Sequence, residues 1–218
     1  QEVKEAFLDL KKNHNIKSLV LDLRGSGGRA IGHILAKEFG IEYYDREILS
    51  LAAKESGFCA EVFEKNDEKN RFLRTLGNII PFIGGGTTYY SNELSNENLF
   101  RIQSEAIRKA AADHSCIFIG RCADYVLRDY PRCVNVFITA DMKDRIANVM
   151  KWSNCSAEKA EEIIEKGDSQ RADFYNFYSS GTWGAASTYH LCINSSVLGI
   201  EVTAAFIKEF ILKKLGEK

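Results

Sequence analysis

Short apolar runs alternate with amphipathic segments along most of the chain. The apolar runs have the length and continuous hydrophobicity of strands in a parallel sheet buried on both faces, and they lie at 17–23, 116–120, 134–140 and 190–194. Apolar residues at three- and four-residue spacing predict helices over 29–39, 96–114, 141–166 and 201–216. This order predicts an α/β fold with a doubly wound, mainly parallel sheet flanked by helices.

Three segments depart from this alternation. Residues 2–12 carry the pattern of a short amphipathic helix, and residues 41–57 predict a short strand or turn followed by a helix. Residues 60–98 are the least regular part, with four glycines and a proline within ten residues. We expect one domain over 1–218 in which 60–98 form a mobile insertion or flap.

Charge and hydropathy narrow the class of protein. The chain has 29 Lys and Arg against 30 Asp and Glu, a formal net charge of −1. This balance argues against nucleic-acid binding through bulk positive charge but allows a local basic pocket. No apolar run approaches the roughly 18–20 residues of a membrane span, and the first 15 residues are too polar for a signal peptide. We expect a cytoplasmic protein without nucleic-acid or membrane partners.

The six cysteines indicate reduced thiols. They are scattered, and none forms a C-x-x-C pair or lies at metal-ligand spacing from a histidine. Three lie in or beside apolar runs, where a reduced cysteine acts as a small hydrophobe: Cys116, Cys133 and Cys192. We expect neither a disulfide framework nor a metal held by the protein.

A glycine cluster, "GSGG" at 25–28, follows the first predicted strand and precedes a predicted helix. Backbone N–H groups of such a turn, together with the helix N-terminus, can cradle phosphate oxygens. Against the full G-x-x-x-x-G-K-[ST] pattern, Leu23 replaces the first glycine, Arg29 the lysine and Ala30 the magnesium-binding hydroxyl residue. From these residues alone, a phosphate-binding loop and a merely tight turn remain equal alternatives.

Longer stretches, from about Gly25 to Ile207, resemble the bacterial cytidylate-kinase-like family of phosphate-loop proteins. They are "GSGGRAIGHILAKEFGIEYYDREILSLAAKESG", "IFIGRCADYVLRDYP", "VNVFITA", "DSQRADFYNFYSSGTWG" and "YHLCINSSVLGIE". The resemblance implies a three-layer phosphate-loop NTPase fold related to nucleoside monophosphate kinases. It also implies that 60–98 are a flap or acceptor-side insertion and 166–188 a lid-like segment. The family usually has arginine where Arg29 stands.

The resemblance further implies roles for individual residues. The phosphates of the phosphoryl donor would be held by Gly25, Ser26, Gly27, Gly28 and Arg29. The acceptor would be bound by Asp45, Arg46, Arg108 and Arg121. In the lid-like segment, Arg171 would reach the phosphates and Asp168 would help seat the acceptor, so Arg29, Arg171 and Asp168 would be catalytic. A surface ion pair is the open alternative for Arg46 and Arg108.

These cations suit phosphoryl transfer, which depends on positioning and charge stabilisation rather than on a covalent nucleophile. We expect a nucleotide kinase that passes the γ-phosphoryl group of Mg²⁺-bound ATP to a small acceptor, with CMP or dCMP as candidates. Cys122 stands where a cytidylate-kinase motif has aspartate, which weakens a cytidine-specific interpretation. Mg²⁺ would be held mostly by phosphates and water, with Ser26 as a candidate ligand. The alternative is a non-catalytic or chimeric scaffold, and a homodimer is an open alternative for its assembly.

The first 28 residues resemble a different family. "EVKEAFLDLKKNHNIKSLVLDLRGSGG" resembles a segment of carboxy-terminal processing proteases, in which a helix precedes an "LVLDLR-x-x-GG" strand. No counterpart of the protease's serine–lysine machinery follows, so we do not expect proteolysis. Asp22 stands where the kinase-like family has arginine and would repel phosphate unless Lys17 or Arg24 pairs with it. The two resemblances meet at the glycine turn, which predicts a recombined or chimeric chain.

Histidines and aromatic residues carry weaker signals. His33, His114 and His190 have no partner at catalytic spacing, so we expect structural or surface roles. The aromatic stretch 173–183 leaves two alternatives: a lid that stacks on a base, or an aromatic loop docked on the core.

Overall fold

The computed structural model describes residues 18–21, 25–45, 96–120 and 122–216. The chain separates into two compact units, one formed by 1–45 and 110–218 and the other by 46–109. The first unit carries the sheet and the glycine turn. The predicted lead-in over 2–12, most of the predicted flap over 60–98, and Asp22 and Leu23 lie outside the described residues.

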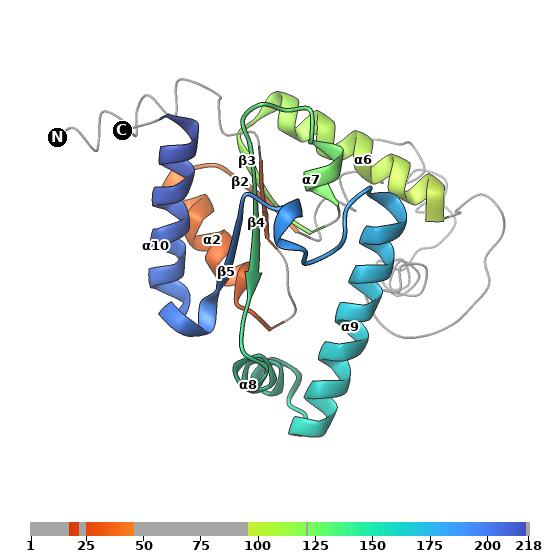
Figure 1. Ribbon diagram of the computed structural model, residues 1–218, viewed down its shortest axis with the longest axis vertical. Helices are drawn as coiled ribbons and strands as arrows, with labels where there is room; N and C mark the ends of the chain where they lie inside the picture. Colours follow the sequence, from red (N-terminus) through yellow and green to blue (C-terminus); the bar gives the residue numbers. More distant parts are fainter. Residues whose placement is uncertain (1–17, 22–24, 46–95, 121, 217–218) are drawn as a thin grey trace, which may run out of the picture. The chain divides into compact units, whose positions relative to one another are not determined.

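Five parallel strands form one sheet in the order β2-β3-β1-β4-β5 (Figure 1). They are β1 (Ser18–Leu21), β2 (Glu42–Tyr44), β3 (Cys116–Ile119), β4 (Cys133–Thr139) and β5 (Leu191–Asn194). The register places Val20 beside Phe118 on one side and Asn135 on the other. This confirms the predicted parallel sheet. Because β1 lies between β3 and β4, the turns that follow these three strands meet at one edge, where ligands bind in such sheets.

Seven helices accompany the sheet in the described part of the chain. They are α2 (Gly28–Phe39), α6 (Asn96–Asp113), α7 (Ala123–Val126), α8 (Met142–Ser153), α9 (Ala157–Tyr178), the 3₁₀ helix η1 (Ala186–Thr188) and α10 (Ser195–Leu215). None of these helices combines the length and apolar character needed to cross a membrane.

Local sequence explains where the helices begin and end. α2 starts after Gly27 and stops at Gly40, both of which have left-handed φ angles, 79° and 63°, that glycine adopts without a Cβ penalty. The predicted helical stretch 141–166 is divided into α8 and α9. Asn154 ends α8 in the left-handed conformation, and the Ser156 hydroxyl accepts the N–H of Lys159 to cap α9.

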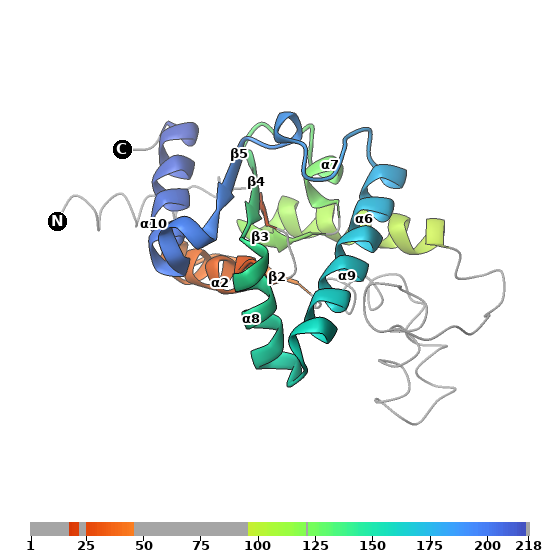
Figure 2. The same ribbon diagram turned by 60° about the horizontal axis from the view of Figure 1, so that its bottom comes forward.

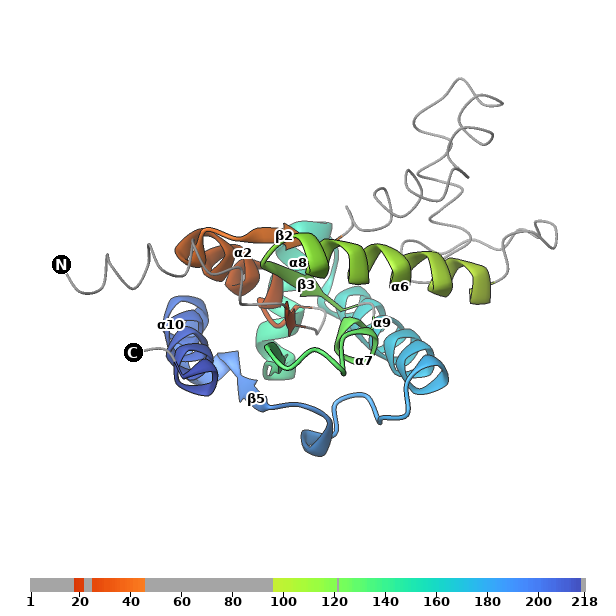
Figure 3. The ribbon, with the colours of Figure 1, turned by 90° about the horizontal axis from the view of Figure 1, so that it is seen from above.

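α2 and α10 cover one face of the sheet, and α7 and α9 lie on the other side (Figure 3). The core between α2, α10 and the strands is mainly apolar, and its buried members include Ile31, Leu35, Ile117, Val134, Val136, Ile138, Ile207 and Ile211. Near the carboxyl edge, α8 and α9 pack side by side through Val149, Ala160 and Ile164 (Figure 2). The architecture is therefore the predicted three-layer arrangement of helices around a sheet.

α9 runs through most of the segment predicted to be lid-like. It continues to Tyr178, so Arg171 lies within a helix rather than in a lid-like turn. The residues fit because Ala, Tyr and Phe here are compatible with a helix and no glycine or proline interrupts 168–178. The helix gives Asp168 and Arg171 a fixed three-residue spacing on one face.

The aromatic loop after α9 is docked on β4. The Trp183 ring meets the Phe137 ring edge-on with centroids 5.6 Å apart, and Tyr189 lies 4.9 Å from Phe137. His190 fixes the end of the loop through two hydrogen bonds of 2.9 Å to Asn135. The backbone N–H of His190 donates to the Asn135 carbonyl, and the ring Nδ1 of His190 accepts the Asn135 backbone N–H. Of the predicted stretch 173–183, residues 173–178 therefore belong to α9, and Trp183 is docked on Phe137 as one of the two alternatives expected.

Candidate functional site

The glycine turn lies between the end of β1 and the N-terminus of α2. Gly25 and Gly27 have φ angles of 82° and 79°, which L side chains rarely adopt. A Cβ on Gly25 would lie 2.9 Å from the Arg145 carbonyl oxygen of α8. The N-cap residue Gly27 has no side chain to cap α2, and the Ser26 hydroxyl accepts the Gly28 N–H at 3.4 Å. The positive end of the helix dipole lies at this turn, an arrangement suited to anions.

Side chains from α8 and α10 contact the backbone of this turn. The Asn148 amide Nδ2 donates to the Gly25 carbonyl at 2.8 Å, and the Ser195 hydroxyl donates to the Ser26 carbonyl at 2.6 Å. Residues far apart in sequence therefore fix the turn.

Arg29 and Asp45 form an ion pair at the carboxyl edge of the sheet. Arg29 lies in the first turn of α2, Asp45 directly follows β2, and their Nη2 and Oδ2 atoms are 2.8 Å apart. The sequence predicted a donor-phosphate role for Arg29 and an acceptor role for Asp45. The structure brings these two residues into direct contact, and both roles stay predictions.

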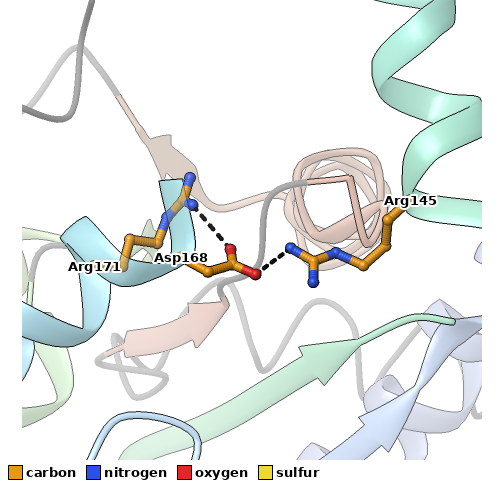
Figure 4. A network of polar contacts seen from close by, with 3 residues as sticks. All are labelled: Arg145, Asp168 and Arg171. Atoms are coloured by element: carbon orange, nitrogen blue, oxygen red, sulfur yellow. Dashed lines mark hydrogen bonds and ion pairs between the residues drawn. The ribbon is translucent and has the colours of Figure 1, made fainter. Parts of the chain in front are cut away.

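Asp168 joins two arginines in a network between α8 and α9 (Figure 4). Its Oδ2 lies 2.5 Å from Nη2 of Arg145, and its Oδ1 lies 3.4 Å from Nη1 of Arg171. All three side chains are mostly shielded from water, with exposed fractions of 8% for Arg145, 20% for Asp168 and 14% for Arg171. Two guanidinium groups thus meet at one carboxylate, and guanidinium groups are well suited to binding anions.

Arg145 was missed by sequence reasoning, as were Asn148 and Ser195. A usable signal existed for Arg145, because it follows a buried strand and is spaced four residues from the buried Val149 on the same helix face. An arginine on the buried face of a helix at the ligand-binding edge is unusual. Asn148 and Ser195 gave no comparable signal, since amide and hydroxyl side chains are common on helix surfaces and at helix starts.

The remaining predicted residues divide into two groups. Arg46 and Arg121 lie outside the described residues. Arg108 lies in α6, in the part of the helix that belongs to the second unit. The structure therefore tests none of these three acceptor-side assignments.

A second buried polar pair connects α7 with α9. The Tyr175 hydroxyl donates to Oδ2 of Asp124 at 2.5 Å. Burial raises the pKa of the Asp124 carboxyl, and the hydrogen bond from Tyr175 opposes this rise. Burial and the neighbouring carboxylate raise the pKa of the Tyr175 phenol, so it stays a hydrogen-bond donor at neutral pH. Tyr175 follows Arg171 by one helical turn, so this contact anchors the helix that carries Arg171.

The described residues at the glycine turn offer backbone N–H groups and guanidinium groups. Among them, no group of three or more His, Cys, Asp or Glu side chains could hold a metal. Ala30 has no hydroxyl, and the Ser26 hydroxyl is buried and accepts the Gly28 N–H at 3.4 Å. The open N-terminus of α2 and the nearby arginines suit a polyphosphate. A magnesium ion would then be held by the phosphates and water.

Solved structures share this fold. An uncharacterized protein from Eubacterium ventriosum ATCC 27560 is similar with a TM-score of 0.68 and 24% identity, covering 90% of this chain and 97% of that chain. Shikimate kinase from Acinetobacter baumannii in complex with shikimate has a TM-score of 0.50 and 16% identity, covering 94% and 97%. TT1252 from Thermus thermophilus has a TM-score of 0.51 and 14% identity, covering 91% and 97%.

Sequence comparison gives the family. No curated protein matches the sequence, but the model of the cytidylate kinase-like family matches residues 22–197. This match includes the glycine turn and both ion-pair networks. It confirms the resemblance seen in the sequence and, together with the parallel sheet, the α/β phosphate-loop fold. The chain belongs to the cytidylate kinase-like family.

Proposed function

We propose that this protein is a phosphotransferase that moves the γ-phosphoryl group of a nucleoside triphosphate to a small acceptor, with CMP and dCMP as the first candidates. The family and the fold support a kinase of nucleotides or other small molecules in general. The observation that carries the proposal is the network of Arg145 on α8 with Asp168 and Arg171 on α9. Arg145 is also the residue whose backbone lies against Gly25.

Phosphoryl transfer requires fixed positive charge around the migrating group and little else from the protein. The N-terminus of α2 and Arg29 supply charge on one side, and Arg145 and Arg171 supply it from α8 and α9. Asp168 holds both guanidinium groups in place, which reduces the reorganisation needed when phosphate arrives. We therefore assign Asp168 primarily to orienting the arginines.

The Arg29–Asp45 pair supports a site with two substrates side by side. A guanidinium binds phosphate oxygens, whereas a carboxylate accepts hydrogen bonds from hydroxyl or amino groups. In this proposal Arg29 contacts the triphosphate and Asp45 contacts the acceptor. Their direct contact in the structure supports the two substrates meeting at this point. Magnesium bound to the triphosphate would add charge neutralisation when present.

A non-catalytic nucleotide-binding protein is the second candidate. Ala30 supplies no hydroxyl to a metal ion, and no acidic cluster in the described residues compensates for it. These two observations favour binding without transfer. The two candidates differ in one measurable respect, the appearance of a phosphorylated acceptor.

Phosphorus NMR of a reaction mixture tests the proposal directly. The full-length protein is incubated with MgATP and, separately, CMP, dCMP, GMP or shikimate, and each mixture is followed for loss of ATP and for a new phosphoester signal. We expect ADP and a phosphorylated cytidine nucleotide. Transfer to shikimate alone would revise the acceptor class.

Variants identify the residues responsible. Arg171→Lys should reduce the rate at least tenfold, because a lysine cannot reproduce bidentate phosphate contact. Arg101→Ala is the matched control, since Arg101 is an exposed arginine paired with Glu105 at 3.0 Å. Saturable MgATP binding without any phosphorylated product would reject the phosphotransferase in favour of the second candidate.

A further inference from the structure

Two consecutive carbonyl groups of the glycine turn are held by side chains from different helices. Asn148 of α8 donates its amide N–H to the Gly25 carbonyl at 2.8 Å. Ser195, the first residue of α10 and only 5% exposed, donates its hydroxyl to the Ser26 carbonyl at 2.6 Å. Neither contact is local, because 123 and 169 residues separate the partners.

Ser195 is itself held in place by neighbouring residues. Its hydroxyl also lies 3.1 Å from the Thr139 carbonyl at the end of β4. The preceding residue, Asn194, caps α10 and donates its side-chain N–H to Asp141 Oδ1 at 2.8 Å. The turn is therefore tied to the starts of α8 and α10 and to the last residue of β4.

Because peptide groups are planar, these two contacts also set the directions of the Ser26 and Gly27 N–H groups. In a trans peptide the carbonyl and the following N–H point in opposite directions, and no cis peptide occurs among the described residues. A Gly25 carbonyl held by Asn148 sends the Ser26 N–H away from Asn148. A Ser26 carbonyl held by Ser195 likewise sends the Gly27 N–H away from Ser195.

Such fixation matters because the turn is rich in glycine. Glycine populates positive and negative φ almost equally, so the peptides around Gly25 and Gly27 have little intrinsic reason to keep one orientation. Binding an anion would otherwise have to order them first, and that cost would reduce affinity. A side-chain donor on each carbonyl removes the alternative in which the peptide is flipped.

We propose that Asn148 and Ser195 are positioning residues that orient the peptide groups of the glycine turn for phosphate before any ligand binds. This proposal rests on the proposed function in one respect: it takes phosphate as the ligand of the glycine turn. It adds two residues that contact neither substrate in the proposal and act through the backbone of Gly25, Ser26 and Gly27.

Ser195→Ala and Asn148→Ala test the proposal, with Ser196→Ala as the matched control. Ser196 follows Ser195 on α10, and its hydroxyl accepts the Asp141 N–H at 2.9 Å instead of contacting the turn. Isothermal titration measures the affinity of each full-length protein for inorganic tripolyphosphate, and urea unfolding measures the stability of each. Amide ¹⁵N–¹H spectra of the ligand-free proteins report the Ser26 and Gly27 N–H groups.

We expect Ser195→Ala and Asn148→Ala each to weaken tripolyphosphate binding about tenfold, in line with the loss of a preorganised hydrogen-bond arrangement. Their Ser26 or Gly27 amide signals should shift or broaden before ligand is added. Ser196→Ala should bind within about twofold of the original protein whatever its stability. Because Asn148 is only partly buried, its variant provides the test even if Ser195→Ala fails to fold.

The outcomes separate the positioning role from the proposed function. Unchanged tripolyphosphate affinity in both variants would overturn the positioning role and leave phosphotransfer standing. Weakened binding by a protein that transfers no phosphoryl group would support the positioning role and reject the kinase. A parent protein that does not bind tripolyphosphate would overturn both.

Discussion

Arg29 and Asp45 are joined by an ion pair of 2.8 Å across the carboxyl edge of the sheet, although one begins a helix and the other follows a strand. The Arg29 side chain is 60% exposed, so water screens much of the attraction and the pair adds little to the free energy of unfolding. Under the proposed function, we expect the contact to act mainly on ligand binding. Asp45 pairs with the Arg29 guanidinium group, to which we assign phosphate binding.

Asp45→Asn should raise the affinity for tripolyphosphate by roughly two- to tenfold, because the anion no longer competes with a carboxylate for Arg29. Thermal stability should change little. Titration calorimetry at low and high salt measures the gain, which should shrink as salt increases. Glu105→Gln, which breaks the more exposed ion pair of Glu105 with Arg101, is the control. Weaker binding by Asp45→Asn would show that Asp45 does not compete for Arg29.

Asp168→Asn should lower the free energy of unfolding by about 1–3 kcal/mol, because it leaves the two guanidinium groups without their shared carboxylate. An anion can take the place of that carboxylate. Tripolyphosphate should therefore raise the melting temperature of Asp168→Asn more than that of the original protein. Differential scanning fluorimetry in chloride and in tripolyphosphate measures both shifts, and equal shifts would contradict an anion site at this network.

Gly25→Ala should destabilise the protein more than Gly216→Ala does. Both glycines have positive φ, 82° and 73°, so both substitutions place an L residue in a conformation that glycine favours. Only Gly25 also faces a steric clash, since its Cβ would lie 2.9 Å from the Arg145 carbonyl oxygen, whereas nothing lies within 4 Å of a Cβ at Gly216. Urea unfolding of the two variants isolates this packing difference, and equal losses would show that α8 moves away from the turn without cost.

The fold was predictable because its strands are continuous apolar runs. In a chain where helices alternate with strands, an apolar run such as 134–140 is interpreted as a buried strand. The alternating order of strands and helices then predicts a parallel sheet. The start of α9 was also predictable, because Ser156 before a helical run is a typical N-cap, and its hydroxyl does cap the helix. The end of α8 was harder to predict. It depends on Asn154 adopting a left-handed conformation at a position where the sequence still has helical periodicity.

The candidate site was predictable only where a motif is continuous in sequence. The glycine turn and the pair Asp168 and Arg171 lie in such motifs. Arg145, Asn148 and Ser195 reach the same place through long-range packing of α8 and α10 against the turn. The spacing of Arg145 from Val149 was the one signal of this packing in the sequence, so the roles of Asn148 and Ser195 emerged only from the structure.

Tyr175→Phe should lower the free energy of unfolding by about 1–3 kcal/mol, since it leaves the buried Asp124 carboxylate without the Tyr175 hydrogen bond. Asp124→Asn should cost less, because it removes the charge that burial opposes. The double variant should be less destabilised than the sum of the two single variants. Chemical denaturation of all four proteins gives this coupling, and strict additivity would exclude an energetically important contact between α7 and α9.

His190 should make stability depend on pH near neutrality. Burial and the nearby Lys214 lower the pKa of its imidazole, and its Nδ1 accepts the Asn135 N–H at 2.9 Å, so the folded protein holds the neutral form. The unfolded chain, with a histidine pKa of about 6.5, takes up the proton first as pH falls. The stabilisation is therefore complete above about pH 7 and is lost as pH falls below about 6.5.

His190→Asn removes the titrating group while keeping a side-chain oxygen that can accept a hydrogen bond. The free energy of unfolding of the original protein, measured in urea between pH 5 and 8, should fall more steeply towards acid than that of the variant. His33→Asn is the control, because it also removes a histidine, but one whose ring stacks on Tyr43 and takes no part in the Asn135 contact. Parallel pH profiles for the original protein and His190→Asn would show that the Asn135 contact persists when the imidazole is protonated, and that the docked aromatic loop is held by its ring contacts with Phe137 instead.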